Sequence, residues 1–281
     1  MYCNHYGFSE EPFEITPDPN FLYMSPGHEE VLTSIIYGIQ SRRGIMAIVG
    51  EVGTGKTTLL NTALEWLSEK TKVAYVINFD VDFDDLLNMA LVNLGLMRAD
   101  QTLTKIEALQ RLKDFALKQL SDSGNVALIV DEAQNLNQKA MENLRLLSNL
   151  ETPKHKLVQI VLSGQPELEI KLARPELRQL TERISIRRHI DPLKEKETYA
   201  YIKHRLEVAG YKGPMLFSPE AQHLIWKISQ GVPRKINILC DNALLIGYLV
   251  QYIHFHCPLY LSNHQLNQML TVDKGHNIGK D

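Results

Sequence analysis

Apolar residues alternate along this chain between short continuous runs and longer stretches at helical spacing. The short runs predict buried strands at residues 44–50, 72–78, 126–131 and 156–162. The helical spacing predicts helices at residues 27–43, 57–70, 83–95, 104–120 and 137–150. Strands that alternate with helices predict parallel pairing through right-handed crossovers, and nearly all-apolar strands predict a sheet covered on both faces. The expected fold class is therefore α/β.

The pattern changes in the second half of the chain. Residues 173–193 predict a helix and an edge strand, and only helices are predicted after the joint near Pro192. Ser218 and Pro219 give one of these helices a cap and a first-turn proline, and Ser262 is a candidate cap for another. Polar residues interrupt the apolar stretch 236–261, which predicts a buried helix and not a transmembrane segment. A small helical domain is thus expected after the sheet.

Composition and charge exclude several classes of protein. The chain has 281 residues, 44% hydrophobic and 22% charged, with a formal net charge of −3, so no global basic field indicates nucleic acid or an anionic membrane. Three distant cysteines without CxxC spacing argue against a disulfide framework or a zinc site. The N-terminus lacks a basic region followed by an apolar stretch, so we expect no signal peptide and a cytoplasmic location. Prolines in residues 1–26 predict an extended arm.

The stretch "GEVGTGKTT" joins a predicted strand to a predicted helix and completes the pattern G-x-x-x-x-G-K-[ST]. Its glycines let main-chain N–H groups approach an anion, and the positive end of the following helix faces the same anion. A plain turn is the alternative, but chance seldom supplies the strand and the helix as well. The residues expected to bind phosphate are Gly50, Glu51, Val52, Gly53, Thr54, Gly55, Lys56, Thr57 and Thr58.

Two adjacent acids, Asp131 and Glu132, end the apolar strand "VALIVD". Ligands collect at the carboxyl ends of parallel strands, so these acids are expected on the same edge of the sheet as the glycine-rich loop. Lys56 then contacts the β- and γ-phosphates, Thr57 and Asp131 hold Mg²⁺, and Glu132 polarises the attacking water. The alternative for the acid pair is a helix cap, which the complete phosphate loop disfavours.

A third polar residue is expected on this edge after the strand at 156–162. "SGQPEL" offers Ser163 and Gln165 for contact with the γ-phosphate or the water. We favour Gln165 because its longer amide reaches both; Ser163 is the rival, and a simple turn is the third interpretation.

Together these segments, with "ERISIRRHIDPL", "GVPRKIN" and the arm "YGFSEEPFEITPDPNFLYMSP", closely resemble the ExeA/GspA (general secretion pathway protein A) family of AAA+ ATPases, which includes MshM-like pilus-biogenesis ATPases. The resemblance covers residues 2–250. It implies a P-loop NTPase (AAA+) αβα core at 45–192, preceded by the arm and first helix at 1–44 as part of the ATPase module. A helical lid at 193–272 and a mobile tail at 273–281 follow.

The resemblance also assigns roles at the nucleotide to particular arginine residues. Arg234, in "GVPR", corresponds to the sensor-2 arginine that reaches the γ-phosphate of its own chain. Arg183 resembles the arginine finger that enters a neighbouring subunit, with Arg178 as second choice. By position, Phe13, Ile15 and Pro233 are candidates for the adenine pocket, although the same side chains suit simple packing.

The function that the resemblance implies is Mg²⁺-dependent ATP binding and hydrolysis in support of a type II secretion or type IV (MSHA-type) pilus apparatus. Expected partners are further copies of the chain, in an ATP-dependent oligomer, and inner-membrane components that place it at the membrane without a transmembrane segment of its own. Two alternatives remain: a DNA-associated AAA+ regulator of the TniB transposition type, and a nucleotide-binding scaffold with slow turnover. Longer relatives continue into a membrane helix and a periplasmic domain, so cell-wall binding is not carried over.

Overall fold

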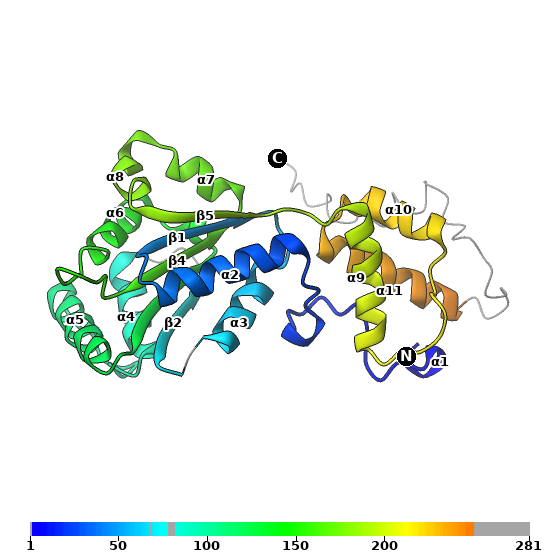
Figure 1. The fold of residues 1–281 in the computed structure, drawn as a ribbon, viewed down its shortest axis with the longest axis horizontal. Coiled ribbons are helices and arrows are strands. Elements are labelled where there is room, and N and C mark those ends of the chain that lie inside the picture. The colour runs from blue at the N-terminus through cyan, green and yellow to red at the C-terminus, as the bar shows by residue number, and fades with distance from the viewer. Residues whose placement is uncertain (1, 68, 78–81, 250–281) are drawn as a thin grey trace, which may run out of the picture.

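Two lobes make up the part of the chain that the computed structural model describes, residues 2–67, 69–77 and 82–249 (Figure 1). One lobe is built on a β-sheet and the other contains helices. The connection that follows the last strand runs from the sheet lobe to the helical lobe, and the N-terminal segment lies beside the helices. The predicted lid segment beyond residue 249, the cap at Ser262 and the tail at 273–281 lie outside the described residues.

Among the described residues, five strands form one parallel sheet in the order β2-β3-β4-β1-β5. Every position of the three central strands is buried, which is the reason they appear in the sequence as continuous apolar runs. The two outer strands are less buried: β2 has buried residues at Ala74 and Val76 only, and β5 alternates between partly buried and exposed positions up to the buried Ile190. The strands are β1 (Ile45–Gly50), β2 (Thr71–Ile77), β3 (Asn125–Asp131), β4 (Gln159–Gly164) and β5 (Ile184–Ile190).

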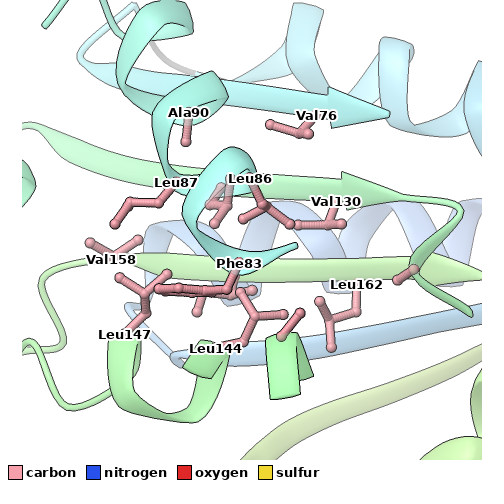
Figure 2. Packing of buried hydrophobic residues seen from close by; sticks show 14 of the residues in the cluster. Val76, Phe83, Leu86, Leu87, Ala90, Val130, Leu144, Leu147, Val158 and Leu162 are labelled. Atoms are coloured by element: carbon pink, nitrogen blue, oxygen red, sulfur yellow. The ribbon is translucent and has the colours of Figure 1, made fainter. Parts of the chain in front are cut away.

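Helices cover both faces of the sheet, as the apolar strands predict. One face carries α2 (Pro26–Gln40) and α3 (Lys56–Trp66), whose apolar residues share a buried cluster with β1, β3 and β4. The other face carries a larger cluster, in which α4 and α6 pack on the strands (Figure 2). The helices of this second face are α4 (Phe83–Asn93), α5 (Lys105–Ser121), α6 (Gln138–Leu147), α7 (Pro166–Leu172) and α8 (Arg178–Thr181).

The region around β4 and before β5 differs most from the predictions. The strand expected at 156–162 is β4, which begins at Gln159, because the chain just before it turns back on itself with an isolated bridge between Glu151 and Lys156. The segment 173–183 holds two short turns of helix, η3 (Pro175–Leu177) and α8, in place of one helix. The α7 helix follows Gln165 and was not predicted; a first-turn proline, Pro166, is its local signal.

The helical lobe contains α9 (Glu195–Val208), α10 (Pro219–Ser229) and α11 (Pro233–Leu249). Its core also takes Tyr2, Phe8, Phe13 and Phe21 from the N-terminal arm, which includes α1 (Cys3–Tyr6) and η1 (Pro19–Phe21) and is not extended throughout. The first 44 residues are therefore shared between the lobes: the arm packs on the helices and α2 packs on the sheet. No helix in the described ranges has the length and apolarity needed to cross a membrane.

Candidate functional site

The glycine-rich loop lies between the end of β1 and the start of α3. Gly53 and Gly55 have φ values of 80° and 97°, in the left-handed region that favours glycine. A Cβ atom on Gly53 would lie 2.5 Å from the Cβ of Arg234, so the loop also packs directly against the first turn of α11. The main-chain N–H of Arg234 donates to the carbonyl of Gly53 over 3.2 Å. The helical lobe thus contacts the loop through Arg234, the residue that the resemblance assigns to sensor 2.

Lys56 is buried, with 6% of its surface exposed, and curls back over its own loop. Its Nζ donates to the carbonyls of Gly50 at 2.8 Å and Glu51 at 2.9 Å. Burial lowers the pKa of Lys56, while the nearby carboxylates of Glu132 and Asp131 act to raise it. The ammonium group is therefore held inside the loop at the start of a helix, the arrangement that suits an anionic ligand.

Asp131, the last residue of β3, accepts hydrogen bonds from three hydroxyl groups of three other elements. Oδ2 accepts from Thr57 Oγ1 and from Tyr75 OH, each at 2.9 Å, and Oδ1 accepts from Ser163 Oγ at 2.8 Å. Burial and the neighbouring Asp131 raise the pKa of Tyr75, so its hydroxyl stays protonated and donates. Thr57 and Asp131 present adjacent oxygen atoms, the ligands that Mg²⁺ prefers. These residues fit the expected metal site.

Glu132 adopts a left-handed backbone conformation, with φ 53° and ψ 37°, which is uncommon for a residue with a side chain and is found at functional sites. Its Oε2 accepts hydrogen bonds from the side-chain amides of Gln134 and of Gln165, the latter at 3.0 Å. Gln134 in turn accepts from the main-chain N–H of Gln165 over 3.1 Å. The two candidates from "SGQPEL" therefore contact different acids: Ser163 contacts Asp131 and Gln165 contacts Glu132.

A cavity of about 470 Å³ lies between the lobes, in the size range of small-ligand pockets. Its lining comes from three parts of the chain. The phosphate loop and Glu132 contribute polar groups, residues 14–18 belong to the arm, and Tyr23, Tyr201 and Pro233 add aromatic and apolar side chains. The cavity thus offers phosphate-binding groups and apolar surface to a single ligand.

The structure brings most of the predicted site residues together at this cavity. Two of them are placed elsewhere. Phe13 is 1% exposed and packs its ring against Phe217 in the helical core, so protein covers the side chain that was expected at the adenine. Arg183 precedes β5, at the end of the parallel sheet opposite to the phosphate loop, and donates to Asn149 and, at 3.0 Å, to Ser148 Oγ. Gly50 and Glu51 contact the lining residue Lys56, and Asp131 contacts the lining residue Thr57. The predicted residues that line the cavity themselves are Ile15, Val52, Gly53, Thr54, Gly55, Lys56, Thr57, Thr58, Glu132, Gln165, Pro233 and Arg234.

Sequence reasoning missed residues that hold the site, among them Tyr75, Gln134 and His28. His28 is 3% exposed, in the first turn of α2, and its Nε2 lies 2.9 Å from the carbonyl of Thr54. A carbonyl only accepts, so Nε2 carries the proton, and Nδ1 accepts from Ser25 Oγ at 2.7 Å. The helix start at Ser25 and Pro26 is visible in the sequence, but nothing local indicates that its histidine reaches the loop.

Replacing His28 with leucine should lower the free energy of unfolding by about 1–3 kcal/mol, because the buried carbonyl of Thr54 would lose its donor. His28→Gln keeps an amide donor of similar reach and should cost less. Chemical denaturation of both variants measures the difference. Equal losses for the two variants would show that the hydrogen bond to Thr54 contributes nothing beyond packing.

The wild type and His28→Gln also test how the free energy of unfolding depends on pH. Burial holds the pKa of His28 below its ordinary value of 6.5. As the pH falls through 6.5, His28 therefore takes up a proton in the unfolded chain but not in the folded chain. The contribution of neutral His28 to the free energy of unfolding is thus complete above that pH and is lost below it. His28→Gln should lose less stability than the wild type between about pH 7 and about pH 5. His204, whose pKa burial also lowers, is present in both proteins and cancels in the comparison.

Comparisons with known proteins agree with this geometry. A family model described as an AAA domain matches residues 39–172. General secretion pathway protein A of Aeromonas hydrophila is 41% identical over 248 residues, which cover 88% of this chain and 45% of that protein. The chain thus spans less than half the length of this curated relative.

Solved structures with the same fold include an Aeropyrum pernix ORC2 protein in ADPNP-ADP complexes, with a TM-score of 0.66 and 19% identity over 94% of this chain and 71% of that one. A Walker-type ATPase of Pyrococcus abyssi has a TM-score of 0.64 and 15% identity over 94% of this chain and 76% of that one. At such identities the likeness concerns the fold, and it confirms the predicted P-loop α/β class.

Proposed function

The chain belongs to the AAA proteins and is a relative of general secretion pathway protein A, and from this premise we propose that it binds ATP with Mg²⁺ and hydrolyses it in support of a type II secretion or type IV (MSHA-type) pilus apparatus. The observation that carries the proposal is the convergence of the phosphate loop, the Thr57–Asp131 pair and Glu132 at one cavity. A fold shared with many nucleotide-binding proteins would not by itself supply a reaction.

Each group of residues at the cavity has a separate role in the proposed reaction. The loop N–H groups and Lys56 bind the phosphates, and Arg234 lines the same cavity from the helical lobe, next to Gly53. Thr57 and Asp131 would hold a Mg²⁺ ion, which neutralises charge on the phosphates. Glu132 orients the attacking water and accepts its proton, and the amides of Gln134 and Gln165 fix the direction of its carboxylate.

The conformation and contacts of Glu132 support a protein that hydrolyses ATP and argue against a scaffold that only binds nucleotide. A carboxylate held by two amides in a left-handed backbone conformation is a costly arrangement for a surface residue. Glu132 lines the same cavity as the phosphate loop, which suits a role in activating a water.

Lys56→Ala tests nucleotide binding directly. Loss of the buried ammonium group should weaken ATP binding by about 100-fold, since a charge-assisted contact to phosphate disappears. Isothermal titration with ATP and Mg²⁺ measures it. Lys105→Ala is the matched control, because Lys105 Nζ contacts Asn143 Oδ1 on the other face of the sheet. Equal affinity in the wild type and Lys56→Ala would contradict the proposal.

The link to a secretion or pilus apparatus rests on the similarity to general secretion pathway protein A over part of that protein's length. We place the chain on the cytoplasmic side, peripheral to the inner membrane through its partners and assembled with further copies of itself. Capture of inner-membrane components by a variant that retains ATP without hydrolysing it, in the presence but not the absence of ATP, is the supporting result.

A further inference from the structure

The turn that carries Glu132 is too short to hold its own shape. Glu132 is the N-cap residue of η2 (Ala133–Asn135), a single turn of 3₁₀-helix. Such a turn has few hydrogen bonds of its own: Asn135 N–H donates to the carbonyl of Glu132 at 3.0 Å, and Leu136 N–H donates to the carbonyl of Ala133 at 3.2 Å. The left-handed conformation of Glu132 is costly, so contacts from outside the turn must maintain it.

Lys171, in the last turn of α7, holds this turn by its main chain. Its Nζ donates to the carbonyl of Leu136 at 2.8 Å and also to the carbonyl of Gln134. Carbonyl groups at the end of a helical turn have no partner within the turn and need one from elsewhere. One ammonium group of α7 thus fixes two points of the chain just after Glu132.

The side chain of Gln134 passes the position of the turn on to the carboxylate. Its Oε1 accepts from the main-chain N–H of Gln165 at 3.1 Å, so its Nε2 is the end that donates to Glu132 Oε2. A Cβ atom on Gly164 would lie 2.7 Å from Gln134 Oε1, so the glycine at the end of β4 makes room for this amide. Lys171 therefore sets the main chain of Gln134, and Gln165 sets its side chain.

Both ends of α7 contact the turn that carries Glu132. Gln165 is the N-cap residue of this helix, and Lys171 lies near its other end. Leu168 and Leu172, which are buried, anchor α7 in the larger core of the sheet lobe. Lys171 does not belong to the described lining of the cavity, so its route to the site runs through the turn.

We propose that Lys171 is a positioning residue for Glu132, which couples the place of α7 in the sheet lobe to the rate of ATP hydrolysis. Lys171 holds the carbonyl of Gln134, and Gln134 holds the carboxylate that activates the water. Other residues bind the nucleotide, so breaking this link changes the chemical step and not the binding. The inference rests on the proposed function and adds from which helix the general base is controlled.

Lys171→Met tests the link, because methionine keeps an unbranched apolar side chain but has no donor. We expect kcat for ATP hydrolysis to fall by about tenfold while the affinity for Mg²⁺-ATP stays at the wild-type value. Lys171→Arg keeps the N–H donors and should recover most of the rate. Release of inorganic phosphate measures kcat, and titration with Mg²⁺-ATP measures affinity.

Lys72→Met is the matched control. Lys72 is exposed at the start of β2, and its Nζ also donates to a main-chain carbonyl, that of Glu69, at 3.3 Å. Its loss should change neither kcat nor the affinity for Mg²⁺-ATP.

A double variant separates positioning from a general loss of structure. Gln134→Leu removes the amide between the turn and Glu132, so adding Lys171→Met to it should cost little further rate. If Lys171→Met does not fold, as thermal denaturation would show, Lys171→Gln takes its place, since it keeps a donor for one of the two carbonyls and should show the same separation of kcat from affinity.

Three results overturn the inference: an unchanged kcat, an equal loss of kcat and affinity, or a double variant whose loss of rate is the product of the two single losses. A wild-type protein that hydrolyses no ATP contradicts the proposed function itself, and the inference falls with it.

Discussion

Replacing Glu132 with glutamine is expected to slow ATP hydrolysis by about 10²- to 10⁴-fold while ATP binding is retained. The amide keeps the shape of the side chain but no longer accepts a proton from the attacking water. The phosphate loop, Lys56 and the Thr57–Asp131 pair are unchanged in this variant, so the ligand is still held. Release of inorganic phosphate measures hydrolysis, and titration with ATP measures binding.

Glu142→Gln provides the control for this experiment. Glu142 lies on the exposed surface of α6, where its Oε1 accepts from Gln138 at 3.2 Å. Its loss should leave both measurements unchanged. Hydrolysis at the wild-type rate by Glu132→Gln would assign the general base to another residue.

Replacing Arg183 with alanine is expected to lower the hydrolysis rate by about 10³-fold or more, the size of effect that a finger arginine has in GTPases. The position of Arg183 in the tertiary structure is the reason why we expect it to act between subunits. Arg183 stands before β5, at the amino end of a strand that runs parallel to β1, whereas the phosphate loop follows the carboxyl end of β1. It therefore does not serve the site of its own chain, and we propose that it serves the site of a neighbouring copy.

A mixing experiment separates this role from a structural one. Glu132→Gln and Arg183→Ala are each inactive, but in a mixed assembly the first supplies Arg183 to the second, whose Glu132 is intact. We expect an equal mixture to recover part of the activity and the wild-type rate per chain to rise with protein concentration. Arg178→Ala is the control, since Arg178 is exposed and pairs with Glu182 at 2.9 Å. A mixture without activity, together with a concentration-independent wild-type rate, would exclude the finger role; loss of activity in Arg178→Ala would move it to that residue.

Local patterns were sufficient to predict the sheet and the centre of the site. The strands β1, β3 and β4 are buried on both faces, and that burial requires the continuous apolar runs seen in the sequence. The phosphate loop depends on glycines and a lysine at fixed spacing, and the acid pair depends on the end of a strand. Each of these rules acts over a few neighbouring residues. A parallel sheet then brings the ends of its strands to one edge.

The remaining features of the site and the core depend on contacts between segments that are far apart in the sequence. Tyr75 reaches Asp131 from β2 across 56 residues, and Arg205 reaches the carbonyl of Pro12 across 193. Phe13 looks in the sequence like any aromatic residue in a proline-rich arm, yet it is covered because the arm packs into the core of the helical lobe.

The sequence by itself therefore determined the class of fold, the phosphate loop and the two acids, because short-range periodicity and spacing encode them. Tertiary structure alone decided which hydroxyl groups hold Asp131, which amides hold Glu132, and which lobe receives the arm. Those choices depend on how separate elements pack against one another, and no local pattern of residues records that packing.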